Sequence, residues 1–387
     1  MNTHHKQLFK AVQCALEETP FLETIIDQKT FFKLARENGV SGMLYPVFKD
    51  SDISAVFKEA LYKDYLAYHR QDILQEDVVN TLTELFNTKA ISHIFLKGVH
   101  LKKLYPEPYM RSMGDIDLLV KVLDYKTARQ HLSAHAFTLW AESEQHSNFT
   151  HESNIEVELH PKLTRDFNPQ IARFLKDPWS HSTQASKQTY TLELEFELIY
   201  LLVHTKRHME DSGIGLRTIL DVGLFLKHYI NVLSKETIDA YLDETNLSKF
   251  FNTLVYLNEH YFGLITFSNT PLKEETTLAI TELILKSGVH GHGASFNPFL
   301  SRFSSKRRQG KGRIIVVLAI LFPSFTSMKG MYPWLKFLPF LYPLTWLIRW
   351  IKLVFLKTRR TFRKIKKLFI SDTTIETTKE LFKEIGL

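Results

Sequence analysis

The chain has 387 residues, of which 44% are hydrophobic and 24% charged, and its formal net charge is +7. This composition is typical of a folded protein with a substantial core, and the single cysteine, Cys14, excludes an intrachain disulfide framework. The polar N-terminus predicts an amphipathic helix and lacks the features of a signal peptide, so we expect a cytoplasmic protein.

The charge is distributed unevenly along the chain. Residues 283–371 contain 18 Lys and Arg and no Asp or Glu, whereas residues 1–282 carry more acidic than basic side chains. The sequence therefore predicts a mildly acidic body followed by a strongly basic, apolar C-terminal region.

Residues 5–90 predict a set of helices. The apolar periodicity of residues 31–40 ends at an Asn-Gly stop, and the run from 54 to 87 is long and amphipathic. We interpret this region as a helical layer that packs on the unit that follows it.

The pattern changes at residue 90. A short apolar strand at 94–96 precedes a helix at 98–105, and a second strand at 115–120 precedes a helix at 125–135. Further strands are expected at 149–151 and 154–160, which predicts an α/β or α+β core of about 90 residues. Helices return at 193–209 and 216–229, on either side of a loop at 211–215.

Two neighbouring strands carry the candidate chemistry. Asp115 and Asp117 are two residues apart, so their carboxylates share one face of a strand and repel each other unless a cation lies between them. Glu156, Glu158 and His160 share one face of a later strand. Three carboxylates can hold two Mg²⁺ ions, which assist in-line displacement at a phosphate.

The turn after the first strand is a candidate phosphate-binding element. Gly98 allows close approach of the backbone, the following helix offers its N-terminal amides, and Lys97 adds a positive charge. Arg111, just ahead of the Asp pair, is a candidate either to steady a phosphate or to pair with a carboxylate.

Together these motifs resemble the bacterial family of uncharacterised nucleotidyltransferases, within the DNA polymerase β-like nucleotidyltransferase superfamily. The resemblance rests on Leu96-Lys97-Gly98, Tyr105, Arg111, Asp115-Ile116-Asp117-Leu118-Leu119-Val120 and Val157-Glu158-Leu159-His160, and more loosely on His204, His208, Arg217 and Asp221.

The resemblance favours Glu158 as the third acid, with Glu156 as the alternative. It also implies that the helix carrying Lys206 and His208 flanks the active site, where these two side chains would contact phosphate or base. Val99 departs from the superfamily pattern because Ser or Gly is usual there, so one hydroxyl contact to phosphate is missing.

Two histidine motifs support weaker hypotheses. His204 and His208 have the spacing of a zinc-protease helix but lack the Glu that follows the first His, which argues against that class. The segment from His290 to Gly293 has the composition of a metal-binding tract without a clustered third ligand, so we expect a loop.

The basic tail leaves three interpretations open. In the first, residues 301–370 contact an anionic membrane surface. In the second, a basic cluster at 359–367 binds nucleic acid, which is the least favoured partner. In the third, the tail packs on the acidic body of the protein. Neither apolar run, 314–322 or 331–355, has the ~20 uncharged residues that a membrane span needs.

We therefore predict an α+β protein in which helical regions flank a small mixed-sheet core. The expected regions are a helical 1–89, a nucleotidyltransferase-like core 90–187, a helical 188–300 and a basic apolar 301–387.

The expected activity is Mg²⁺-dependent transfer of a nucleoside monophosphate from an NTP to an unknown acceptor, with release of pyrophosphate. The expected catalytic metal ligands are Asp115, Asp117 and Glu158, and the expected nucleotide-binding residues are Lys97, Gly98, Arg111, Lys206 and His208. The alternative is a non-catalytic nucleotidyltransferase-like scaffold, or an accessory protein at the inner membrane surface in cell-surface polysaccharide or peptide-product biosynthesis.

Overall fold

The computed structural model describes residues 1–143, 146–163, 168–289, 322–325, 328, 332–355 and 372–387. They form two compact units. The larger contains almost all described residues up to 289, and the smaller contains most of those from 322 onward.

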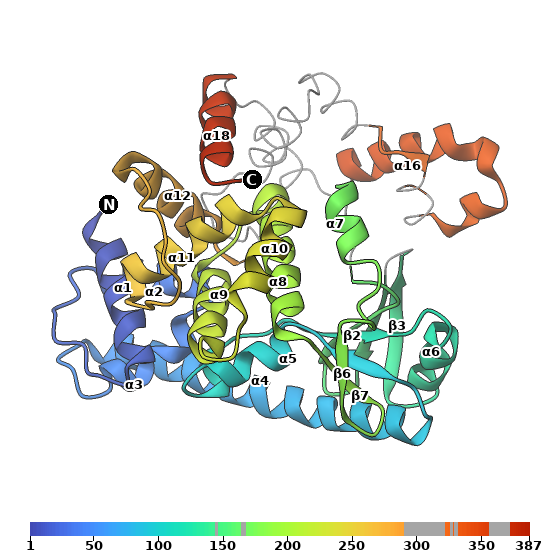
Figure 1. Cartoon of the computed structure of the whole chain (residues 1–387), viewed down its shortest axis with the longest axis horizontal. Helices are drawn as coiled ribbons and strands as arrows, with labels where there is room; N and C mark the ends of the chain where they lie inside the picture. Colours follow the sequence, from blue (N-terminus) through green and yellow to red (C-terminus); the bar gives the residue numbers. More distant parts are fainter. Residues whose placement is uncertain (144–145, 164–167, 290–321, 326–327, 329–331, 356–371) are drawn as a thin grey trace. The chain divides into compact units, whose positions relative to one another are not determined.

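The larger unit begins with the expected helices. They are α1 (Thr3–Leu16), α2 (Gln28–Glu37), the one-turn α3 (Tyr45–Phe48) and the long α4 (Ala55–Thr88). Ser54 caps α4 by accepting a hydrogen bond from the Phe57 amide, so the helix starts where the amphipathic pattern starts. In Figure 1, α4 runs along the base of this unit and passes beneath the sheet.

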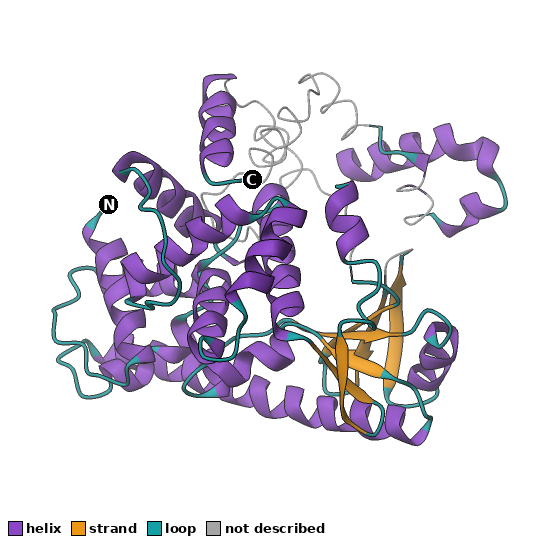
Figure 2. Cartoon of the chain, in the orientation of Figure 1, coloured by secondary structure: helices purple, strands orange, loops and turns teal. Residues whose placement is uncertain are grey.

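Seven strands form one mixed sheet, drawn in orange in Figure 2, in the order β3-β4-β5-β2-β1-β7-β6. Only the β2–β5 and β1–β7 pairs are parallel. The strands are β1 (His93–Phe95), β2 (Asp115–Val120), β3 (Phe137–Glu142), β4 (Ser147–His151), β5 (Glu156–His160), β6 (Ser182–Ser186) and β7 (Thr189–Leu192).

One face of the sheet forms the core. Ile116, Leu118 and Val120 of β2 are fully buried, with Val157 and Leu159 of β5 beside them. They pack with apolar residues of α4 and α6 (Tyr125–Ser133). The acidic side chains of β2 and β5 are therefore left on the opposite face, as the alternation along a strand predicts.

Helices complete the unit. They are α5 (Gly98–Leu101), α7 (Pro169–Phe174), α8 (Leu194–Asp211), α9 (Leu216–Tyr229), α10 (Lys235–Thr245), α11 (Ser248–Phe262) and α12 (Glu274–Ser287). The expected α+β class is confirmed, because a mixed sheet is flanked by helices on both sides of it in sequence. The expected helix at 98–105 is shorter: α5 is one turn, and a 3-10 turn at Lys102–Leu104 follows it.

The smaller unit contains 3-10 turns at Pro333–Lys336 and Pro339–Leu341, then α16 (Tyr342–Phe355) and α18 (Asp372–Glu384). Among the described residues, no helix is long and apolar enough to cross a membrane. The expected loop at 290–293, nearly all of the apolar run 314–322 and the basic cluster at 359–367 lie outside the described residues.

Candidate active site

The parallel pairing of β2 with β5 brings the candidate acids together. In its register Asp115 lies beside Glu156, and Asp117 lies beside Glu158. All four carboxylates line one cavity of about 1090 Å³. Two rows of acids on adjacent strands therefore face a space large enough for a nucleotide.

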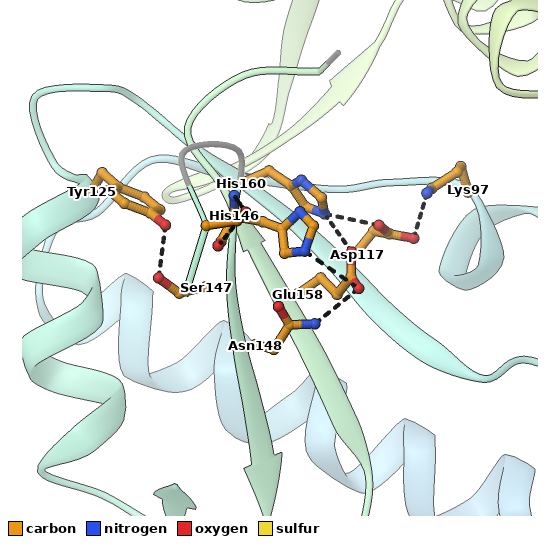
Figure 3. A network of polar contacts seen from close by, with 9 residues as sticks. Lys97, Asp117, Tyr125, His146, Ser147, Asn148, Glu158 and His160 are labelled. Atoms are coloured by element: carbon orange, nitrogen blue, oxygen red, sulfur yellow. Dashed lines mark hydrogen bonds and ion pairs between the residues drawn. The ribbon is translucent and has the colours of Figure 1, made fainter. Parts of the chain in front are cut away.

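Asp117 is buried at the centre of a polar network. Lys97 Nζ lies 2.7 Å from its Oδ2, and His160 Nε2 lies 2.9 Å from its Oδ1. Figure 3 shows these two cations meeting different oxygens of the carboxylate. Burial alone would raise the pKa of Asp117, but Lys97 and His160 together outweigh it and hold the pKa far below its usual range.

Asp115 is in the opposite electrostatic situation. Burial, followed by the negative charge of Asp117, raises the pKa of Asp115 to about 6. No hydrogen-bond donor or ion-pair partner for its carboxylate occurs in the described part of the chain. A largely buried, unpartnered carboxylate next to a second one is a donor set that favours a divalent cation, so these residues fit a bound Mg²⁺.

Glu158 is held from two directions. Asn148 Nδ2 donates to its Oε1 over 3.0 Å, and His160 Nε2 lies 3.4 Å from its Oε2. Burial would raise the pKa of Glu158, but the hydrogen bond from His160 contributes to a net decrease. Glu156 is exposed at the start of β5 and also lines the cavity, so both candidates for the third acid face the same space.

The Lys-Gly turn has two structural features that the sequence did not reveal. Lys97 has φ 48° and ψ −105°, a conformation that costs a non-glycine residue about 1–3 kcal/mol and that directs its ammonium group to Asp117. A Cβ on Gly98 would lie 2.2 Å from Met113 Sδ, so a larger residue here would force the Met113 side chain to move. Its contact with phosphate stays a prediction, and one turn of helix provides only a small dipole.

Val99 is buried in the sheet core, in the cluster that contains Met113 and Ile116. It is not among the described residues that line the cavity. The choice of Val99 over a hydroxyl-bearing residue therefore affects the packing of the core and not the described lining of the cavity.

Arg111 pairs with a carboxylate, one of the two roles expected for it. Its Nε and Nη2 donate to the two oxygens of Asp221 on α9, over 2.7 and 2.8 Å. Tyr105 also donates to Asp221, over 2.9 Å. All three side chains are buried, so this network fixes the segment ahead of β2 against α9.

Several cations line the cavity and were not assigned to the site from the sequence. They are Lys162, Arg207 and Arg217. Arg217 Nη1 donates to the Ser112 carbonyl, while its buried Nε has no partner in the described part of the chain. Arg217 belongs to the looser part of the resemblance, whereas Lys162, just after β5, and Arg207, within α8, match no local motif.

The helix α8 flanks the cavity, as the resemblance implied. His204 and His208 line it, and burial lowers the pKa of His204 well below its usual value. Arg207 lines it as well, whereas Lys206 is not among the described lining residues.

His146 is a further residue that sequence reasoning missed. Together with Glu158 and His160 it forms a group whose possible ligand atoms all lie within 4.8 Å of one another. Strand alternation could have indicated His146, because it lies two residues before Asn148 and therefore on the same face of the hairpin that contains β4.

Comparison with protein families gives one finding for this chain. The model of a family described as "Uncharacterised nucleotidyltransferase" matches residues 25–263, which include the whole sheet and the cavity. No curated protein and no solved structure matches the chain.

Proposed function

Because the chain belongs to the family of uncharacterised nucleotidyltransferases, we propose that it transfers a nucleoside monophosphate from an NTP to an acceptor, with release of pyrophosphate. The observation that carries the proposal is the register of β2 and β5. It places Asp115, Asp117 and Glu158 on one wall of a nucleotide-sized cavity that cations also line.

Asp115, Asp117 and Glu158 would hold two Mg²⁺ ions at this wall. When bound, the ions neutralise the phosphate and stabilise an in-line displacement. The partly buried and unpartnered state of Asp115 supports this assignment, since a cation would remove its repulsion with Asp117.

The protein's own cations would bind the triphosphate. Arg217 has a buried Nε–H without a partner, which a phosphate oxygen can satisfy. Arg207 and Lys162 are exposed on the cavity lining and can neutralise further phosphate charge. His208 also lines the cavity, whereas Arg111 acts indirectly by positioning the segment ahead of β2.

Transfer can be tested with α-labelled NTPs, Mg²⁺ and a panel of sugar, small-molecule, protein and nucleic-acid acceptors. We expect label transfer and pyrophosphate release from one class of acceptor. The Asp115→Asn, Asp117→Asn double variant should fall to the background without enzyme, and Glu152→Gln, which replaces an exposed acid in the turn between β4 and β5, should not. A double variant as active as the parent would refute the assignment.

One observation favours a second candidate, a scaffold that binds a partner without catalysis. Lys97 and His160 already neutralise both oxygens of Asp117, so this carboxylate is stable without a metal ion. Such a scaffold should show no Mg²⁺-dependent binding of NTP, which separates it from the enzyme.

We also propose that the smaller unit contacts an anionic lipid surface. Phe337 is 83% exposed, Phe340 73% and Leu347 62%. The surrounding stretch, residues 283–371, is basic and free of acid. Exposed apolar side chains within a basic stretch are typical of segments that lie at a membrane interface.

Co-sedimentation of the full chain with vesicles tests this contact. We expect binding to phosphatidylserine vesicles and not to neutral phosphatidylcholine vesicles. Phe340→Asp with Leu347→Asp should abolish it, and Val56→Asp, an exposed apolar position on α4, should not. Equal pelleting of all three proteins would contradict the proposal.

A further inference from the structure

A cluster of two histidines and one glutamate lies at one end of the cavity. His160 and Glu158 share a face of β5, and His146 directly precedes β4. Ser147 pairs with Leu159 and Asn148 with Glu158, so the antiparallel register continues to bring residue 146 opposite His160. The sheet itself therefore determines that these three side chains meet.

The geometry within the cluster is compact. The ring centroids of His146 and His160 are 5.1 Å apart, and the possible ligand atoms of all three residues lie within 4.8 Å of one another. Glu158 Oε1 lies 3.8 Å from His146 Nε2, and Oε2 lies 3.4 Å from His160 Nε2. Figure 3 shows both imidazoles directed to the same carboxylate.

These ligand types do not suit Mg²⁺, which prefers an all-oxygen shell. Two imidazole nitrogens with one carboxylate are typical of Zn²⁺, Co²⁺ and related ions, and three protein ligands leave a position open for water or substrate. We propose that His146, Glu158 and His160 form a binding site for a divalent transition-metal ion of this class.

Metal binding at this site would change the surroundings of the neighbouring carboxylate of Asp117. His160 Nε2 donates to Asp117. Ligation through that nitrogen would release its proton to solvent, so Asp117 would lose one of its two cationic partners. The inference goes beyond nucleotidyl transfer and does not depend on it, although Glu158 is shared with the proposed Mg²⁺ site.

Co²⁺ titration of the full-length, chelator-treated protein tests the site, because Co²⁺ reports its ligands by visible absorption. We expect absorption bands of a cobalt ion with nitrogen ligands, displaced by Zn²⁺ and not by excess Mg²⁺. His146→Gln and His160→Gln should each weaken binding by at least about tenfold. His135→Gln, which replaces an exposed histidine in the turn between α6 and β3, should bind like the parent.

The His146→Cys variant provides a direct readout that does not depend on loss of binding. A thiolate at this position should give an intense sulfur-to-cobalt charge-transfer band, which requires contact between residue 146 and the metal. Unchanged titrations in both Gln variants, absence of this band, or displacement of Co²⁺ by equimolar Mg²⁺ would each overturn the proposal.

The same samples separate this inference from the proposed function. If Co²⁺ binds through the histidines while NTP is neither bound nor consumed, the metal site stands and nucleotidyl transfer fails. If NTP transfer requires Asp115 and Asp117 while the His variants retain full Co²⁺ binding, the inference fails and nucleotidyl transfer stands.

Discussion

Replacing Asp115 with Asn should stabilise the metal-free protein at alkaline pH. Burial and the neighbouring Asp117 raise the pKa of Asp115 from 3.8 to about 6 in the folded state. The folded state therefore holds this proton more tightly than the unfolded state, so the free energy of unfolding falls as pH rises through this range. The difference corresponds to about 3 kcal/mol at pH 8, which the Asn variant recovers.

The assay is urea and thermal unfolding in the presence of a chelator, at pH 8 and pH 4.5. For a protein of this size, 3 kcal/mol corresponds to a rise in melting temperature of about 4 °C. We expect the full gain at pH 8 and about a third of it at pH 4.5, because the carboxyl of the unfolded chain is still largely ionised there. Glu152→Gln, which removes an exposed carboxylate from the turn between β4 and β5, should change stability little at either pH.

Addition of Mg²⁺ should reverse the order of stability at pH 8. The parent protein gains stability because the ion binds its folded state, and the variant gains less because it has lost a ligand. The reasoning is refuted if Asp115→Asn is no more stable than the parent at pH 8, or if its advantage is the same at both pH values.

Three further predictions concern the cations of the site. Asp221→Asn should lower the free energy of unfolding by about 3–5 kcal/mol in urea, because it leaves Arg111 buried without its charge partner; a loss below 1 kcal/mol would contradict the buried pair. Arg217→Gln should raise the dissociation constant of Mg–NTP about tenfold, and it should also lower the melting temperature because it removes the hydrogen bond to the Ser112 carbonyl; unchanged affinity would remove Arg217 from the phosphate site. Lys97→Met should raise the pKa of Asp117, so acid unfolding should begin at a higher pH than in the parent. Overlapping acid-unfolding curves would argue against this ion pair.

Much of the sheet and its helices could be predicted from local pattern. Strand β2 has the expected bounds at 115–120, and α9 has the expected bounds at 216–229. Both have a clear apolar periodicity, which is visible in the local sequence. Strands β3 and β6 were missed, because most of their side chains are exposed and little alternation marks them as half-buried.

The candidate site could be predicted only in part, because some of its contacts join residues that are far apart along the chain. The shared face of Asp115 and Asp117 follows from spacing alone. The partner of Arg111 does not, because Asp221 is brought to it by packing of a helix that lies far along the chain. The close packing at Gly98 likewise depends on Met113, which folding places against it.

The most direct test of the account is calorimetric titration of Mg–NTP into the parent and into the Asp115→Asn, Asp117→Asn double variant. The account predicts binding to the parent that requires Mg²⁺ and is lost in the double variant, with each protein folded by circular dichroism. Equal binding of Mg–NTP to both proteins, or no binding to the parent, would contradict it.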